Sequence, residues 1–322
     1  MRYPMKLKAP LKDYLWGGTR LKEEYGKETQ LTKVAESWEL ACHRDGKSVI
    51  ANGAAKGRTL ADWLAAEGAG ALGTKAAKFP YFPLLIKLID AHDDLSVQVH
   101  PNDDYALRVE GEYGKAELWY VVDAAVGAEL LYGFQYEITK EEFRRRIEDN
   151  TLLDVVRRVP VKKGDVFFIP AGTLHAIGKG ILICEIQQNS NTTYRIYDYN
   201  RKGADGKGRE LHTELAKDAI DYTFQNDYQT HYTSQPGAAV ELVQCPYFTT
   251  RLLETETPMM RDYATLDSFV VYICMAGSVE LRDDNGNELT VSQGQTVLFP
   301  ATTQSVTLKP APQAKLLETY IA

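Results

Sequence analysis

An internal repeat is the feature that most constrains how this chain can fold. Residues 164–171 read GDVFFIPA, and residues 294–301 read GQTVLFPA. A run of β-branched and aromatic residues precedes each copy, at 118–122 and at 269–273, and each run leads on to a glycine. Duplicated units of short strands separated by turns are typical of jelly-roll barrels. The sequence therefore predicts a mainly β protein with two such barrels.

The two units differ in the connection between their halves. In the first unit Thr139 and Glu142 form a capping-box pattern, and Phe143 and Ile147 follow at helical spacing. The second unit has only a short DDNGN turn there, and Asn-Gly between strands is a strong hairpin signal. We therefore expect a helical insertion near 137–158, in the first barrel only.

Turn residues mark a boundary between the two units. The SQPG sequence at 234–237 has a low apolar content and is the best linker candidate in the chain. It predicts a first domain at 1–235, which carries the insertion, and a second domain at 236–322. Further helical patterns occur at 59–66 and 214–220.

The composition excludes several classes of protein. The 322 residues include 37 basic and 44 acidic side chains, and the resulting net charge of −7 excludes a strongly basic nucleic-acid footprint. We expect neither a membrane span nor a secretory signal, because the chain has no run of about 18 apolar residues and no apolar run near its N-terminus. No CxxC pair occurs, so the cysteines are expected to be reduced thiols: Cys42, Cys184, Cys245 and Cys274. We therefore expect a soluble protein of the cytoplasm.

Three polar segments of the first unit occur in an order that suggests a metal site. In the strand pattern SVQVH, alternation places Ser96, Gln98 and His100 on one face. Glu117 opens an apolar strand, and His175 follows a Pro-Ala-Gly-Thr-Leu turn. Each segment alone has an ordinary explanation: a solvent-facing edge, a surface ion pair or a structural histidine. Together they indicate nitrogen and oxygen ligands that converge from separate strands on one metal ion.

The repeat supplies an internal control for this site. Aligning the two copies places His175 opposite Ser305, and aligning the preceding strands places Glu117 opposite Phe269. The second unit therefore keeps the scaffold without the ligands. We expect one metal ion per chain, in the first barrel.

A later segment adds further polar candidates. Glu185 lies on a strand pattern, and a polar loop then leads to Arg195, whose donor fork suits a phosphate or an enolate oxygen. A surface salt bridge is the alternative for this arginine. The GAGALG sequence at 68–73 matches a dinucleotide fingerprint, but it follows a helical pattern instead of a strand, so we interpret it as a loop. The remaining histidines are expected on the solvated surface: His43, His92, His212 and His231.

Taken together, these motifs resemble the type I mannose-6-phosphate isomerases, which are zinc-dependent phosphomannose isomerases with a cupin fold, in their short bacterial form. The matching segments all lie before residue 196, and the last third of the chain matches only in general texture. They are WGG at 16–18, AESWEL at 35–40, FPLLIKLID at 82–90, VQVHP at 97–101, GKAE at 114–117, IPAGTLHAI at 169–177, and EIQ at 185–187 through Arg195.

The resemblance implies two cupin-like barrels that interconvert mannose 6-phosphate and fructose 6-phosphate through an enediol, with one Zn²⁺ per chain. It implies the metal ligands Gln98, His100, Glu117 and His175, the catalytic residues Arg195, Lys115 and Glu185, and the substrate-binding residues Ser96, Lys87 and Trp16, of which Ser96 and Lys87 face the phosphate. Many relatives have an aspartate four residues before the arginine, whereas this chain has Asn191. Glu185 is therefore the better candidate for proton transfer. The expected partner is a small sugar phosphate, and the expected state is a monomer or a weak homo-oligomer.

Two other functions stay open at this point. His100, His175 and Glu117 nominally form the two-histidine, one-carboxylate set of an iron-dependent cupin oxygenase, although Gln98 would fill an extra ligand position. A non-catalytic sugar-binding cupin is the second alternative, and the further polar residues around the metal argue against it.

Overall fold

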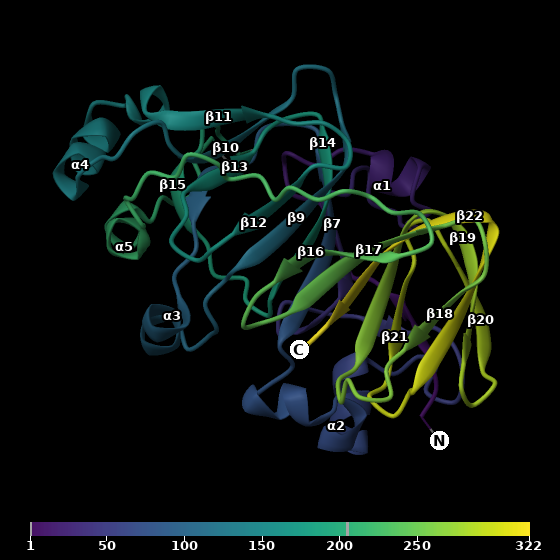
Figure 1. The fold of residues 1–322 in the computed structure, drawn as a ribbon. Helices are drawn as coiled ribbons and strands as arrows, with labels where there is room; N and C mark the ends of the chain where they lie inside the picture. Colours follow the sequence, from purple (N-terminus) through teal and green to yellow (C-terminus); the bar gives the residue numbers. More distant parts are fainter. Residues whose placement is uncertain (1, 204–205) are drawn as a thin grey trace.

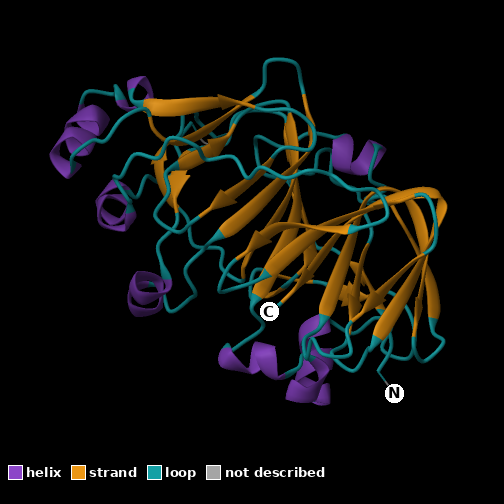
Figure 2. Ribbon diagram, viewed as in Figure 1, coloured by secondary structure: helices purple, strands orange, loops and turns teal. Residues whose placement is uncertain are grey.

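The computed structural model describes residues 2–203 and 206–322, and over these residues the protein is mainly β, as predicted (Figures 1 and 2). Most strands belong to three large sheets. The six-stranded sheet has the order β12 (Val166–Ile169), β9 (Glu117–Ala124), β14 (Ile181–Gln188), β7 (Leu84–Ala91), β3 (Glu36–Leu40) and β2 (Leu11–Lys12). The five-stranded sheet has the order β11 (Val156–Pro160), β10 (Glu129–Phe134), β13 (His175–Ile177), β8 (Val97–Val99) and β15 (Tyr194–Tyr197).

The third sheet has nine strands. Its main path is β16 (Ala239–Gln244), β17 (Thr249–Thr255), β22 (Ser305–Tyr320), β19 (Val270–Asp283), β21 (Thr296–Phe299), β1 (Met5–Lys8) and β6 (Val49–Ile50). Two further strands pair outside this path, β18 (Met259–Asp262) with β22 and β20 (Glu288–Ser292) with β19. A separate small hairpin consists of β4 (Cys42–His43) and β5 (Gly46–Lys47).

The hydrophobic cores show how the sheets pack. Trp119 and Ile183 of the six-stranded sheet share one buried cluster with Tyr132 and Ile177 of the five-stranded sheet. The other face of the six-stranded sheet packs against the nine-stranded sheet, where its residues share a second cluster with Val271. The six-stranded sheet is therefore the middle layer of the molecule and is covered on both faces.

Alternation along β9 explains how one strand serves two cores. Trp119 and Val121 lie in the core between the six-stranded and five-stranded sheets, which together we call the first barrel. Leu118 and Tyr120 lie in the core shared with the nine-stranded sheet. Because successive side chains of a strand point to opposite faces, Glu117 shares the face of Trp119. This carboxylate therefore lies inside the first barrel, and its exposed fraction is 0%.

The nine-stranded sheet, which we call the second barrel, contains the second copy of the repeat together with strands from the start of the chain. Met5 pairs with Leu298 across β1 and β21, and β6 continues the sheet beyond β1. Figure 1 accordingly shows the N-terminus beside the C-terminal strands. The domain boundary at 235/236 stays a prediction. A division at that point separates residues 5–8 and 49–50 from the nine-stranded sheet that they extend.

Short helices cover the sheets: α1 (Arg20–Glu23), α2 (Leu60–Glu67), α3 (Asp103–Val109), α4 (Lys140–Glu148) and α5 (Thr213–Ala219), with 3₁₀ turns η1 (Ala69–Ala71), η2 (Thr74–Lys78) and η3 (Leu152–Asp154). The predicted cap of α4 is confirmed, because the Thr139 hydroxyl accepts a hydrogen bond from the Glu142 N–H at 3.1 Å. Figure 1 shows α4 and α5 beside the five-stranded sheet, away from the second barrel. The helix α3 is not among those predicted from the sequence; Asn102 caps it by accepting a hydrogen bond from the Tyr105 N–H at 3.0 Å.

Three smaller predictions can be compared with the structure. The GAGALG segment follows α2 and contains η1, so it is a loop after a helix, as predicted. All four cysteines are free; Cys184 and Cys274 are buried, and the other two are partly buried. Among the helices of the described residues, none combines the length and apolar character that crossing a membrane requires.

Strand register corrects the alignment of the two repeat units by one residue. Trp119 pairs with Phe167 of the first copy, and Tyr272 pairs with the equivalent residue of the second copy, Val297. Tyr272 is therefore the counterpart of Trp119, so Glu117 lies opposite Val270 and the alignment with Phe269 is wrong.

The same correction applies to His175. The Glu-Leu pair at 129–130 corresponds to the Glu-Leu pair at 280–281; Leu130 pairs with Ile177, and Leu281 pairs with Leu308. His175 therefore lies opposite Val306 and not opposite Ser305. A valine offers no metal ligand, so the second unit still lacks counterparts of Glu117 and His175.

Candidate active site

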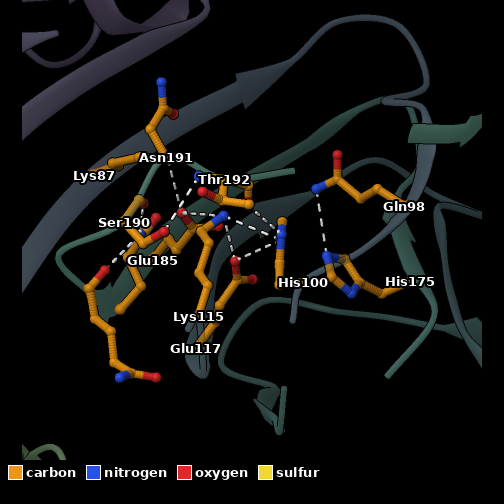
Figure 3. Close-up of polar contacts among 12 residues, drawn as sticks. Lys87, Gln98, His100, Lys115, Glu117, His175, Glu185, Ser190, Asn191 and Thr192 are labelled. Carbon is orange, nitrogen blue, oxygen red and sulfur yellow. Dashed lines mark hydrogen bonds and ion pairs between the residues drawn. The ribbon is translucent and has the colours of Figure 1, made fainter. Parts of the chain in front are cut away.

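Three buried side chains of the first barrel bring their ligand atoms together. His100, Glu117 and His175 each offer one atom, and these atoms lie within 4.8 Å of one another. His100 directly follows β8, Glu117 opens β9, and His175 opens β13. Their sheets face each other, so residues that are distant in the sequence meet inside the barrel (Figure 3).

Both imidazoles are held in the tautomer whose Nε2 carries no proton. The Nδ1 of His100 lies 2.9 Å from the carbonyl oxygen of Thr192, and the Nδ1 of His175 lies 2.8 Å from that of Thr173. Because a carbonyl only accepts hydrogen bonds, each Nδ1 must carry the proton. Burial lowers the pKa of His175 and, with help from Lys115, lowers that of His100 to about 3. The two rings are therefore neutral at pH 7, as a metal ligand must be.

The carboxylate of Glu117 supplies the negative charge. Its Oε1 lies 3.0 Å from His100 Nε2 and 2.5 Å from Lys115 Nζ, and its Oε2 is buried without a hydrogen-bond partner. Burial favours the neutral acid, but the charge of Lys115 outweighs it and holds the pKa of Glu117 well below its ordinary value. A buried, charged oxygen with no partner beside two imidazole nitrogens is a donor set that suits a divalent metal ion.

Gln98 extends this donor set. It pairs with His175 across β8 and β13, and the two side-chain nitrogens are 3.3 Å apart. Rotating the terminal amide by half a turn would direct its oxygen to the same place, because the two ends of an amide are nearly the same in shape. Figure 3 shows Gln98 and His175 on one side of His100, with Lys115 and Glu117 on the other.

Two lysines and a second carboxylate lie beside this cluster. Glu185 is buried; its Oε1 lies 3.2 Å from Lys87 Nζ and 4.0 Å from Lys115 Nζ, and its Oε2 accepts a hydrogen bond from Trp119 Nε1 at 3.0 Å. Burial and the nearby charge of Glu117 raise the pKa of Glu185, and both lysines oppose this rise. Its pKa therefore lies closer to neutrality than that of an ordinary glutamate, as a proton-transfer group requires.

A polar cavity of about 260 Å³ opens above the cluster. It is lined by seven of the ten predicted site residues: Trp16, Lys87, Ser96, Gln98, Lys115, Glu185 and Arg195. The other three, His100, Glu117 and His175, are fully buried next to it. The structure therefore brings all ten predicted residues to one place.

Arg195 reaches the cavity from β15. It pairs with Gln98 across β15 and β8, and its Nη1 donates to the carbonyl of Glu210 at 2.9 Å, while its Nε has no partner. Burial and the charge of Arg209 lower its pKa. A partly unsatisfied guanidinium that faces a polar cavity is available to bind an anionic oxygen.

Several residues that line the cavity are not among the site residues predicted from the sequence. Tyr14, Glu36 and Arg209 line the cavity. Glu36 belongs to the AESWEL segment, where its acidic side chain in a strand pattern was an available signal. Arg209 lies in a charged, glycine-rich stretch without periodicity, so only the fold reveals that it lies near Arg195.

The prediction of a solvated surface position is wrong for His43. Its exposed fraction is 5%, and its Nε2 lies 3.2 Å from an oxygen of the buried Glu112. The sequence gives little sign of this contact, because the two residues are 69 positions apart.

Comparison with known proteins gives consistent matches. A family model described as phosphomannose isomerase type I, catalytic domain, matches residues 5–125. The probable mannose-6-phosphate isomerase GmuF of Bacillus subtilis is 38% identical over 304 residues, which cover 94% of each chain. The mannose-6-phosphate isomerase of Streptococcus mutans is 43% identical over 250 residues, or 77% of this chain and 78% of that protein. The crystal structure of the mannose 6-phosphate isomerase from B. subtilis is 33% identical with a TM-score of 0.89, covering 98% of this chain and 99% of that one.

Proposed function

The chain belongs to the type I phosphomannose isomerase family, and on that premise we propose that it interconverts mannose 6-phosphate and fructose 6-phosphate with one zinc ion as its cofactor. The observation that carries the proposal is the buried cluster of His100, Glu117 and His175 at the base of a polar cavity. Glu117 Oε2 has no partner in this cluster, and a divalent cation would compensate its buried charge.

The proposed zinc ligands are Gln98, His100, Glu117 and His175. The donor set of two imidazoles, one carboxylate and one amide oxygen matches the nitrogen and oxygen ligands that zinc accepts. When bound, zinc would orient and polarise the oxygen atoms of the open sugar. Thr192 and Thr173 orient the two rings through their carbonyl groups, so that both unprotonated Nε2 atoms would be available as ligands.

The chemistry requires a proton to move between C1 and C2 through an enediol. We assign this transfer to Glu185, because its raised pKa and its position on the cavity wall suit a general base. Asn191, at the position where many relatives have an aspartate, lines the same cavity but carries no carboxylate. Lys115, 4.0 Å from Glu185, would stabilise its anionic form.

The negative charge that develops on the enediolate oxygen requires a fixed positive group. We assign this role to Arg195, whose Nε has no partner and whose side chain lines the cavity. Ser96 and Lys87 are proposed to face the phosphate, and Trp16 to form an apolar wall for the sugar. Lys87 is already paired with Glu185 and Glu36, so it would bind the phosphate as part of a charged network.

A coupled assay for fructose 6-phosphate formed from mannose 6-phosphate, with and without a chelator, tests this function. We expect turnover that the chelator abolishes and that added Zn²⁺ restores, with about one zinc per chain by metal analysis after anaerobic purification. Stoichiometric iron would favour the oxygenase, and sugar binding without turnover would favour the non-catalytic cupin. Either result would overturn the proposal.

The remaining proposals concern the setting of the enzyme. The four free cysteines support a reducing compartment, and we propose that the protein acts in the cytoplasm on a small sugar phosphate. We propose that it is a monomer or a weak homo-oligomer, which light scattering across a concentration series would test.

A further inference from the structure

A buried carboxylate outside the proposed ligand set holds one wall of the cavity. Glu112 has an exposed fraction of only 6% and lies in the turn after α3. Its Oε2 accepts hydrogen bonds from Thr192 Oγ1 at 3.2 Å, from the Asn191 N–H at 3.3 Å and from Ser190 Oγ at 3.4 Å. One carboxylate oxygen therefore accepts hydrogen bonds from three successive residues of the loop at 190–192.

The other oxygen of Glu112 is held by the β4–β5 hairpin. His43 Nε2 lies 3.2 Å from Oε1, and Arg44 Nη2 lies 2.6 Å from it. The same hairpin contacts the loop directly, because Asn191 Nδ2 donates to Asp45 Oδ2 at 2.8 Å. Glu112 thus joins the hairpin and the loop, and the ordered donors on both sides offset the cost of burying its charge.

The loop at 190–192 contacts both the proposed metal cluster and the cavity. The carbonyl oxygen of Thr192 accepts a hydrogen bond from the Nδ1–H of His100 at 2.9 Å. Asn191 lines the cavity, as does Thr193, the residue after the loop. A shift of this loop would therefore change the orientation of one imidazole and the shape of the cavity together. Groups that orient a metal ligand in this way typically affect metal affinity or activity by about 10- to 100-fold.

We propose that Glu112 is a positioning residue. By accepting hydrogen bonds from the 190–192 loop, it holds the Thr192 carbonyl against His100 Nδ1 and so keeps the unprotonated Nε2 of His100 directed into the proposed metal cluster. The proposal rests on the function proposed above. It concerns a residue that touches neither the cluster nor the substrate cavity, so its effect must be transmitted through the loop.

The substitution Glu112→Gln tests this role, because it keeps the size of the side chain but replaces an acceptor oxygen with a donor. We expect the folded variant to bind Zn²⁺ about 10- to 100-fold more weakly in competition with a chromophoric chelator. We expect kcat with saturating Zn²⁺ to fall as well, because Asn191 is displaced. Glu148→Gln is the matched control: the same change at a carboxylate of α4 with 69% side-chain exposure should leave zinc affinity unchanged.

A purely structural role would give a different result. If Glu112→Gln lowers the thermal midpoint of the metal-free protein but binds zinc as tightly as the natural protein, the proposal is wrong. If that variant does not fold, Thr192→Val and Ser190→Ala each remove one donor and leave Glu112 in place. Each should weaken zinc binding by about twofold to tenfold, and natural affinity in both would overturn the proposal.

Measuring zinc binding and turnover of the natural protein beside the variant separates this inference from the proposed function. A natural protein that neither binds zinc nor forms fructose 6-phosphate contradicts the function itself. A natural protein that does both, beside a Glu112→Gln variant that does both equally well, contradicts only the role of Glu112.

Discussion

The two barrels place a buried glutamate at the same position and neutralise it in different ways. Glu185 pairs with Trp119 across β14 and β9, and Glu318 pairs with Tyr272 across β22 and β19. Trp119 and Tyr272 are equivalent in the repeat, so the two glutamates are equivalent as well. Glu185 accepts a hydrogen bond from Trp119 Nε1, and Glu318 accepts one from the hydroxyl of Tyr272.

The source of the compensating charge differs between the barrels. In the second barrel Glu318 accepts hydrogen bonds from Arg261 Nε at 2.8 Å and Nη2 at 3.0 Å. Arg261 pairs with Val306 just as Gln98 pairs with His175, so the guanidinium comes from the strand position of a proposed metal ligand. The hydroxyl of Tyr263 also contacts Glu318.

The comparison suggests how one scaffold supports two roles. The first barrel contains a cluster of possible metal ligands beside an open polar cavity, and its lysines leave Glu117 Oε2 without a partner. In the second barrel, an arginine supplied by the chain itself completes the polar interior. The Glu117 oxygen without a partner is free to bind an exchangeable cation, whereas both oxygens of Glu318 are paired with an arginine that stabilises the fold.

The largest expected effect is on the stability of the second barrel. The substitution Arg261→Met leaves Glu318 buried without its cation, so we expect the free energy of unfolding to fall by about 3–5 kcal/mol, measured by urea denaturation. The double variant Arg261→Met/Glu318→Leu should recover much of this loss, because no unpaired charge remains. A single variant as stable as the natural protein would show that the pair is not needed to compensate Glu318.

The next effect is on turnover in the first barrel. We expect Arg195→Ala to keep its zinc but to lose turnover by about 10²–10³-fold, because one donor to the developing oxyanion is removed. Arg251→Ala, at the second barrel, is the control and should leave turnover near that of the natural protein. Normal turnover by Arg195→Ala would remove this arginine from the mechanism.

A pH effect should separate the barrels, because every histidine of the chain precedes residue 236. The folded pKa of His100 is about 3, below the value near 6.5 of an unfolded chain. As the pH falls from about 6.5 towards 3, the unfolded chain takes up a proton that the folded metal-free protein cannot. Its stability should therefore fall by up to about 1.4 kcal/mol per pH unit for this histidine.

The variant His100→Gln isolates this contribution. Glu185, whose raised pKa acts in the opposite direction, is present in both proteins and cancels in their difference. Urea denaturation of both metal-free proteins between pH 7 and pH 5 measures that difference, because Glu117, which contacts His100, takes up its proton in the unfolded chain only at lower pH. Equal slopes would contradict the assignment to His100.

The smallest effect concerns the insertion, which the second barrel lacks. Thr139→Ala removes the side-chain acceptor for the Glu142 N–H, so the local stability of α4 should fall by about 1 kcal/mol. Hydrogen exchange of the α4 amides should accelerate, while zinc binding should not change. The variant Thr139→Ser, which keeps the hydroxyl, should behave like the natural protein.

Much of the fold could be predicted from local patterns. The capping threonine of α4 and the apolar strand β9 are both determined by neighbouring residues, through capping preference and through alternation along the strand. The one-residue error in aligning the repeats arose because a run of β-branched and aromatic residues does not determine which residues pair across two strands. Register depends on which face a distant sheet covers, and the pairing of Tyr272 with Val297 decided it.

The proposed site divides in the same way. The types of the candidate ligands were visible in the sequence, because a histidine or glutamate in an apolar strand requires a partner. The buried contact of His43 with Glu112 was not visible, since neither residue lies in a pattern that points to the other. The addition of β1 to the second barrel was equally hidden, because it depends on an edge left open by strands almost 300 residues away.

By itself, the sequence determined the chemistry available to this protein: the repeat, the strand alternation, and the histidines, carboxylates and arginine that could act. Only the tertiary structure decided that Gln98 and His175, 77 positions apart, are neighbours. It also decided that Glu318 is paired with an arginine, while Glu117 Oε2 has no hydrogen-bond partner. The physical reason is that side-chain types and alternation are local properties. Charge compensation inside a barrel depends on distances that exist only after the sheets have closed around their cores.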